Sequence, residues 1–338
     1  MGKTYNQSLK QARSKQKVAH FLHVPFTGLG NYSGYRGANW LKNRIKIFKQ
    51  FVVPSLLQQT KKDFILWVAW RREEKNNSQV IELKEWLDTT GIKSVFTYSG
   101  IAFWDDKYDE VTARVRLLDA LHGSMGALIN VMGEADTVLL TIQPSDDVYD
   151  KRAVEGVRHV LSTTDNQAFG FSKGYIMDYQ IGKLAEWNPK TNPPFYTIKF
   201  PRDIFIDPLK HAEYTAIKED CGQYKAGTPI PSHEYVGKAL KYAYVDERGF
   251  LVGTHSDNIS TIFKHPYAGE QFSGEERYNI LKNFGLQDLP LLKVKFSLRK
   301  KLMRKLPHKV LRKLRFLAGE KKWWGRPIFN LVYNFLRG

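Results

Sequence analysis

The sequence predicts an α/β fold built on a mostly parallel β-sheet flanked by helices. Short apolar runs alternate with longer amphipathic segments over the first 150 residues, which is the pattern of βαβ units. The run at residues 137–142, TVLLTI, is continuously apolar, as expected of a central parallel strand. Apolar residues form 42% of the 338 residues, enough for a large buried core in one large domain or two ordinary ones.

The elements follow from these patterns in chain order. We expect strands at residues 18–24, 64–70, 93–98 and 137–142. Helices are predicted at residues 41–58, with a kink or restart at Pro54, at 78–87, and at 110–131. After Asp147 the pattern predicts a helix at 150–161, a hairpin-like region at 169–184 and a proline-rich stretch, so the second half is expected to be α+β.

Composition excludes several classes of protein. The single Cys221 excludes an internal disulfide and a zinc site built from cysteines, so a reducing, cytoplasmic setting is expected. The polar, lysine-rich N-terminal residues do not predict a secretory signal peptide. The longest uncharged apolar run near the C-terminus, residues 327–336, is shorter than the roughly 20 residues of a membrane-spanning helix.

The net charge of +18 is concentrated at the C-terminus. Residues 291–338 hold 15 of the 52 basic residues and one of the 34 acidic residues, so this tail carries +14 and residues 1–290 only +4. Pro290 is therefore the predicted boundary between a globular body and a basic tail. Within the body we expect two halves, at about 17–150 and 151–290.

The tail has the pattern of a basic amphipathic helix, divided at Pro307 and followed by interfacial aromatics. Its basic face includes Lys300, Arg304 and Arg312, and Trp323 and Trp324 follow. Its apolar stripe is formed by Leu298, Leu302, Leu306, Val310, Leu314 and Leu317. Packing on the body would explain the stripe but not the charge, and nucleic acid would explain the charge but not the stripe. We therefore expect peripheral binding to an anionic membrane, on its cytoplasmic face, and no nucleic-acid partner.

Two carboxylates, Asp146 and Asp147, come directly after the predicted central strand. Ligands bind at the carboxyl ends of strands in open α/β sheets. Paired carboxylates there are suited to hold Mg²⁺ or Mn²⁺, with a diphosphate filling the remaining coordination positions. The alternative interpretation is that Ser145-Asp146-Asp147 is a turn that caps the helix after it.

Three segments resemble nucleotide-sugar glycosyltransferases of the GT-A fold. Residues 42–48, KNRIKIF, and residues 54–68, PSLLQQTKKDFILWV, are similar to the opening of these enzymes. The strand 137–142 with Ser145-Asp146-Asp147, and the late segment THSDNIST at 254–261, look most like the rhamnosyltransferase group. The resemblance implies a Rossmann-like, mixed and mostly parallel sheet, with a donor half at 17–150 and an acceptor half at 151–290.

The resemblance also implies roles for single residues. Asp146, Asp147 and His255 would hold Mn²⁺ or Mg²⁺, and Asp146 and Asn258 would lie at the sugar donor. Arg114 and Arg116, on the helix before the central strand, would meet the donor phosphates, since arginine offers a planar fork to phosphate oxygens. The alternatives are a hydrogen-bonded loop histidine at His255 and a solvated helix face for the two arginines.

An inverting transfer also needs a base within hydrogen-bond reach of the acceptor hydroxyl. We expect Asp220 in this role, and Glu234 is the second candidate. A charged surface turn is the alternative interpretation of Asp220, and a helix-start acid that of Glu234.

The chain departs from the family pattern at two points. Pro144 stands where the metal-binding phrase of the family begins with an acid, and residues 69–72, AWRR, hold no acid to read a nucleobase. The sequence thus predicts a hexosyltransferase, metal-dependent, that moves a sugar such as rhamnose from a nucleotide diphosphate to a glycan or lipid-linked acceptor. The alternative function is a noncatalytic membrane-surface or nucleic-acid binding protein that uses the basic tail.

Overall fold

The computed structural model describes residues 17–27, 38–100, 110–190, 193, 195–222, 224–230, 233–255, 263 and 268–293. The side chains of residues 100, 110–117 and 246 are not described. The predicted residues Asn258, Lys300, Arg304, Arg312, Trp323 and Trp324 lie outside the described part, as does nearly all of the basic tail.

Ten strands in the described part form one sheet, in the order β10-β7-β6-β8-β4-β1-β2-β3, with β9 on β6 and β5 on β9. The strands are β1 (Val18–Pro25), β2 (Ile65–Arg71), β3 (Ser94–Gly100), β4 (Thr137–Ile142), β5 (Val148–Tyr149), β6 (Ala168–Asp178), β7 (Leu184–Trp187), β8 (Tyr196–Pro201), β9 (Tyr242–Thr254) and β10 (Ala268–Phe272). Strands β4, β1, β2 and β3 are parallel, and so are β6 and β9. The other pairs are antiparallel.

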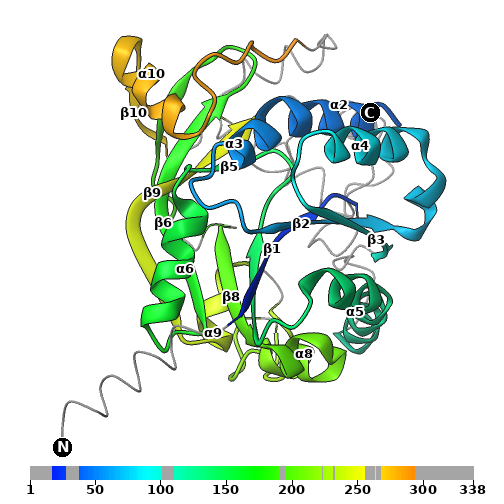
Figure 1. Ribbon diagram of the computed structural model, residues 1–338. Helices are drawn as coiled ribbons and strands as arrows, with labels where there is room; N and C mark the ends of the chain where they lie inside the picture. Colours follow the sequence, from blue (N-terminus) through cyan, green and yellow to red (C-terminus); the bar gives the residue numbers. More distant parts are fainter. Residues whose placement is uncertain are drawn as a thin grey trace, which may run out of the picture.

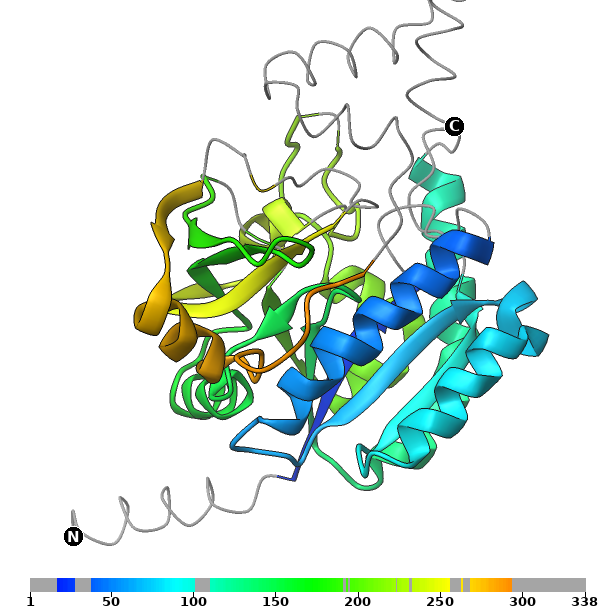
Figure 2. The same ribbon diagram turned by 90° about the horizontal axis from the view of Figure 1, so that it is seen from above.

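Helices cover both faces of the parallel half (Figure 1). The α-helices of the described part are α2 (Ala38–Ile47), α3 (Val53–Leu57), α4 (Ser78–Asp88), α5 (Glu110–Met132), α6 (Ala153–Thr163), α7 (Arg202–Ile206), α8 (Pro208–Tyr214), α9 (Val236–Ala239) and α10 (Gly274–Asn283). Figure 2 shows α2 and α4 side by side on one face, whereas α5 and α8 lie on the other.

The alternation of side chains along the strands explains these two layers. Leu22 and Val24 of β1 pack with the core under α2, α3 and α4, whereas Phe21 points to the opposite face of the sheet and packs with α5 and α7. Strand β2 repeats the pattern, because both of its faces are buried along the whole strand except at Arg71. The predicted α/β class with a mostly parallel sheet flanked by helices is confirmed.

The predicted long helix at residues 41–58 is wrong in one respect. A π-helical turn, Phe48–Val52, interrupts it between α2 and α3. Pro54 lies in the first turn of α3, so of the two alternatives expected for it the restart is the one that the structure shows.

The hairpin predicted at residues 169–184 is formed by β6 and β7, and it continues to Trp187. Gly174 lies in the middle of β6. A Cβ atom at this position would lie 2.5 Å from the Phe250 carbonyl oxygen and ring, so glycine is required where β6 and β9 meet.

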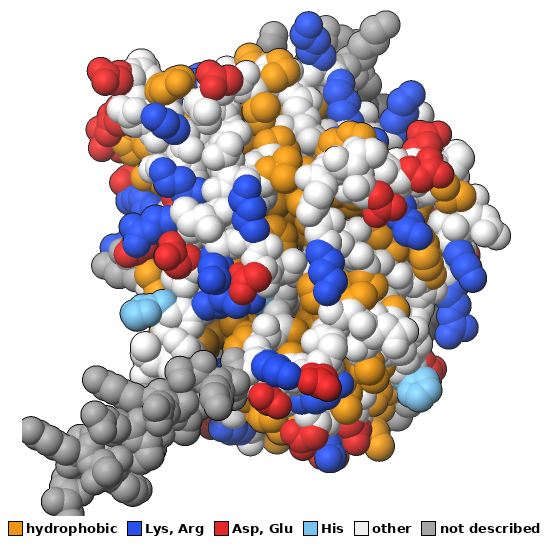
Figure 3. Space-filling view, viewed as in Figure 1, with side chains coloured by type: hydrophobic (Ala, Val, Ile, Leu, Met, Phe, Trp, Pro, Cys, Tyr) orange, Lys and Arg blue, Asp and Glu red, His pale blue; other side chains and the backbone are white. Residues whose placement is uncertain are grey.

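Charges of both signs are mixed over the face shown in Figure 3, as the small net charge of residues 1–290 requires. No helix in the part of the chain that the structure describes is long and apolar enough to cross a membrane.

The core holds three buried histidines, His20, His23 and His211. Burial lowers the pKa of His20 and of His23 to about 3 and that of His211 to about 4. Arg158 contributes to the shift at His20, and His211 to that at His23. All three are therefore neutral in the folded protein at neutral pH.

These histidines predict that acid weakens the fold. The unfolded chain binds protons below about pH 6.5 and the folded core does not, so each histidine removes about 1.4 kcal/mol of unfolding free energy between about pH 7.5 and 5.5. His20→Gln, which can keep the hydrogen bond to Thr141, should reduce the measured fall in unfolding free energy by that amount. Urea titrations at both pH values measure it. The matched control is His159→Gln on the exposed face of α6. An equal fall in unfolding free energy in both variants would contradict the assignment of this fall to the buried His20.

Candidate functional site

Asp146 and Asp147 lie in the loop that follows β4, at the carboxyl end of the parallel strands. Gln143 extends the ladder by one residue, with its N–H 2.8 Å from the carbonyl oxygen of His23 in β1. The chain then turns and forms β5, which pairs with Phe250 and Leu251 of β9. The capping alternative for this acidic pair is wrong, because α6 begins only at Ala153, after β5.

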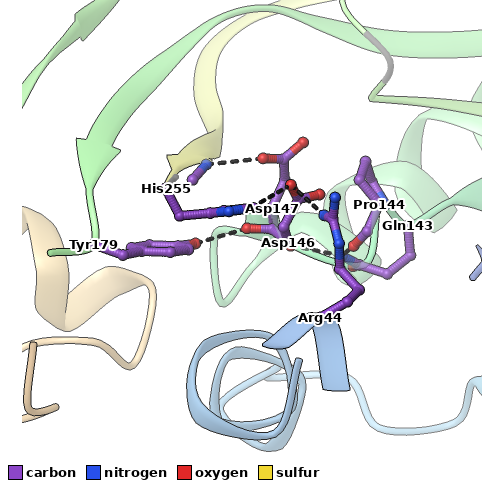
Figure 4. A network of polar contacts seen from close by, with 8 residues as sticks. Arg44, Gln143, Pro144, Asp146, Asp147, Tyr179 and His255 are labelled. Carbon is purple, nitrogen blue, oxygen red and sulfur yellow. Dashed lines mark hydrogen bonds and ion pairs between the residues drawn. The ribbon is translucent and has the colours of Figure 1, made fainter. Parts of the chain in front are cut away.

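The side chain of Asp146 joins two distant segments (Figure 4). Arg44 of α2 forms an ion pair through Nη1 with Asp146 Oδ2. His255, directly after β9, places Nε2 3.0 Å from the same oxygen. All three side chains are mostly shielded from solvent, with 6% of Arg44, 14% of Asp146 and 1% of His255 exposed.

Asp147 points away from Arg44, toward β9. Its Oδ1 accepts a hydrogen bond of 2.8 Å from the backbone N–H of Gly253. Gly253 has no room for a side chain, because a Cβ atom would lie 2.3 Å from the Asp146 carbonyl oxygen and from the ring of Tyr179. The close approach of β9 to the acidic loop therefore requires glycine.

Further hydrogen bonds fix the backbone of this loop. Tyr179, after β6, donates its hydroxyl to the carbonyl oxygen of Asp146 at 2.9 Å. The Gln143 side-chain amide donates to the carbonyl oxygens of Pro144 and Asp147, at 2.9 and 2.8 Å. Pro144 thus serves as an acceptor in the turn.

The PSLLQQT phrase supports the segment that follows the acidic loop. Ser55 donates its hydroxyl to the carbonyl oxygen of Tyr149 at 2.9 Å, and the Gln59 amide donates to that of Asp150 at 2.8 Å. Gln59 also accepts from the N–H of Val154 at 3.2 Å. The backbone N–H of Thr60 donates to the carbonyl oxygen of Lys151 at 2.8 Å. This phrase is therefore part of the framework of the site.

The two carboxyl groups have opposite electrostatic surroundings. Burial would raise the pKa of Asp146, but Arg44 and His255 outweigh it and hold that pKa below the usual range. Asp146 is therefore ionised, and the His255 Nε2–H donates to it. Burial, with the neighbouring charge of Asp146, raises the pKa of Asp147 well above its usual range.

This arrangement does not fit a divalent cation as the residues stand. Oδ2 of Asp146 already accepts from Arg44 and His255, and Asp147 is turned to Gly253. Among the described residues, no group of three or more His, Cys, Asp or Glu side chains is placed to hold a metal. Binding of Mn²⁺ or Mg²⁺ stays a prediction.

The remaining predicted residues are spread over the structure. Asp220 lies in an exposed turn, where it binds Lys225 Nζ at 2.8 Å and the Ala226 N–H at 2.9 Å; the hydrogen bond from Lys225 lowers its pKa. Glu234 is exposed in a short 3₁₀ turn. Arg114 and Arg116 lie in α5, and their side chains are not described. The catalytic and donor-binding roles of these four residues stay predictions.

The structure adds Arg44, Tyr179, Gln143 and Gly253 to the site. A signal for Arg44 was present in the sequence. It shares the apolar spacing of Leu41, Ile45 and Phe48, so it falls on the buried side of its helix. A buried arginine needs a partner, and an acid at the sheet edge supplies one.

No protein-family model matches this chain, and no curated protein matches it in sequence. Among solved structures it is similar to S. aureus TarS 1–349, with 12% identity and a TM-score of 0.35 over 89% of this chain and 79% of that one. The complex of TarS 1–349 with UDP-GlcNAc is similar at 11% identity and a TM-score of 0.36, over 89% of this chain and 80% of that one. A Desulfovibrio desulfuricans G20 protein, provisionally named a nucleotide-diphospho-sugar transferase, is similar at 14% identity and a TM-score of 0.31, over 81% of this chain and 98% of that one. Similarity at this level does not assign an activity.

The ion pair at the site predicts non-additive stability effects. Arg44→Met removes the cation beside the buried Asp146 charge and leaves that charge to hydrogen bonds such as the one from His255, which should lower the unfolding free energy by about 3 kcal/mol. Adding Asp146→Asn removes that charge, so the double variant should be more stable than Arg44→Met alone. Urea titrations of the wild type, the two single variants and the double variant at neutral pH measure these unfolding free energies. Additive losses from the two substitutions would show that the ion pair does not stabilise the fold.

Proposed function

We propose that the protein is a nucleotide-sugar glycosyltransferase of the GT-A type. The observation that carries the proposal is the buried ion pair of Asp146 and Arg44, closed by His255, at the carboxyl end of β4. Open α/β sheets bind ligands at this edge. The PSLLQQT phrase, the acids after β4 and His255 lie in three separate segments of the sequence. Their meeting at one place supports the family resemblance.

The arrangement suits the chemistry of sugar transfer. When the bond from the sugar to the nucleotide breaks, negative charge develops on the leaving diphosphate, and a preorganised cation in a shielded site stabilises it. Arg44 is such a cation, because Asp146 and the surrounding core hold its guanidinium in one position.

The finer assignments belong to the proposal and rest on the sequence. Rhamnose is the sugar that the resemblance implies, and Asp220 or Glu234 would take the proton from the acceptor hydroxyl. The acceptor is a glycan or a lipid-linked sugar, as in polysaccharide biosynthesis.

The start of the basic tail supports an acceptor at a membrane surface. The Leu292 N–H donates to the carbonyl oxygen of Tyr179 at 2.7 Å, and the hydroxyl of Tyr179 binds the Asp146 backbone. Lys46 and Gln50 bind the carbonyl oxygens of Lys293 and Pro290. In Figure 2 this segment runs beside α2 and α3. The chain thus enters the tail next to the site, and a tail on anionic lipid would bring the site to the cytoplasmic face of the membrane.

The proposed donor predicts a rise in melting temperature on nucleotide binding. Ligands that bind only the folded state stabilise it by mass action. Titration with UDP-, dTDP- and GDP-sugars and the free nucleotides, with and without Mn²⁺, should raise the melting temperature for one nucleotide class. Asp146→Ala should abolish the rise, and Asp63→Ala, remote from the acidic loop, should keep it. The transferase proposal fails if no nucleotide shifts a well-folded protein under any condition.

The tail predicts charge-dependent binding to anionic vesicles. Lys300→Glu, Arg304→Glu and Arg312→Glu together should abolish flotation with vesicles of phosphatidylcholine and phosphatidylglycerol, since each basic residue near the surface contributes about 1 kcal/mol. Reversing the exposed Lys61, Lys62 and Lys75 of the body is the matched control. Equal loss in both variants would show that net charge, and not the tail, binds the vesicles.

A further inference from the structure

Arg44 and Trp40 carry buried hydrogen-bond donors that no described residue satisfies. The Arg44 Nε–H and the Trp40 Nε1–H are both shielded from solvent and have no hydrogen-bond partner there. The two residues lie one turn apart on α2, and the guanidinium stands 5.3 Å from the centre of the Trp40 ring. A buried donor without an acceptor destabilises the fold, so two neighbouring ones indicate a site for an acceptor-rich ligand.

The two donors without an acceptor favour a ligand rich in oxygen acceptors over a cation. The positive guanidinium of Arg44 is paired with the Asp146 carboxylate, and Asp147 Oδ1 accepts the Gly253 N–H. These carboxylate oxygens, which a hard divalent cation would need as ligands, are therefore already engaged by donors. A diphosphate, by contrast, offers several oxygens that can accept hydrogen bonds from the two donors. It can bind the guanidinium directly, without a metal between them.

We propose that Arg44 is the cation of this site, acting where the family resemblance places a divalent metal. Asp146 and His255 hold the guanidinium in position, and Arg44, with the Trp40 indole N–H beside it, binds the diphosphate of the donor. Nucleotide binding is therefore independent of metal. The inference rests on the proposed function, because it names the group that recognises the donor phosphates.

The first test measures binding of UDP, dTDP and GDP to the full chain by calorimetry, in EDTA and in Mn²⁺. The nucleotide that binds should do so with equal affinity in both conditions. Arg44→Gln should weaken binding by about tenfold or more, the loss of one charge-assisted hydrogen bond. Arg44→Lys, which keeps the charge without the fork, should weaken it less, and Trp40→Phe should weaken it severalfold.

The matched control is Lys42→Gln, which removes one positive charge from the exposed side of the same helix. It should leave the affinity unchanged, and circular dichroism confirms that each variant is folded. Binding that requires Mn²⁺, or an equal loss in the Lys42 and Arg44 variants, would overturn the role of Arg44 and leave the transferase proposal intact. Absence of binding by every nucleotide in both conditions would overturn the transferase proposal, and the inference would fail with it.

A second test uses Mn²⁺ alone and needs no nucleotide and no variant at Arg44. Free Mn²⁺ measured by electron paramagnetic resonance should show no stoichiometric binding to the wild-type protein. Stoichiometric binding that Asp146→Asn removes would overturn the inference directly, because the carboxylate would then hold the metal in place of Arg44.

Discussion

The ion pair between Asp146 and Arg44 is the contact on which the geometry of the candidate site depends. It joins the loop after β4 to α2, the helix that follows β1. Burying both charges costs free energy, which is recovered only if the partners stay together and their other polar atoms are satisfied. His255 and the hydrogen bonds around the loop provide that satisfaction on the Asp146 side.

The sheet supplies the rigid frame around this pair. Strands β6 and β9 are parallel over most of their length, and both end at the site, with Tyr179 following β6 and His255 following β9. The Tyr179 N–H donates to the Thr254 carbonyl oxygen at 3.0 Å, so these two ends are bonded to each other. Gly253 then allows β9 to approach the acidic loop closely. A ligand bound here meets groups whose positions were fixed by folding.

Much of the architecture could be predicted from local patterns, because both faces of the parallel strands are buried and the flanking helices have clear apolar stripes. The convergence of Asp146 and His255 could be predicted only through the family resemblance, since 109 residues separate them. The pairing of β5 with β9 is equally distant, and no local pattern distinguishes a two-residue strand from a helix start. Arg44 can be located from the sequence only by its place on the apolar side of α2, and that place does not identify Asp146 as its partner.

The central claim is that the Asp146–Arg44 pair binds a nucleoside diphosphate. A crystal structure of the protein with the nucleoside diphosphate that stabilises it most, grown in the presence of EDTA, tests this most directly. The account predicts phosphate oxygens within hydrogen-bond distance of the Arg44 guanidinium and the Trp40 indole N–H, with Asp146 still bound to Arg44. A diphosphate held elsewhere on the molecule, away from Arg44 and the acidic loop, would contradict it.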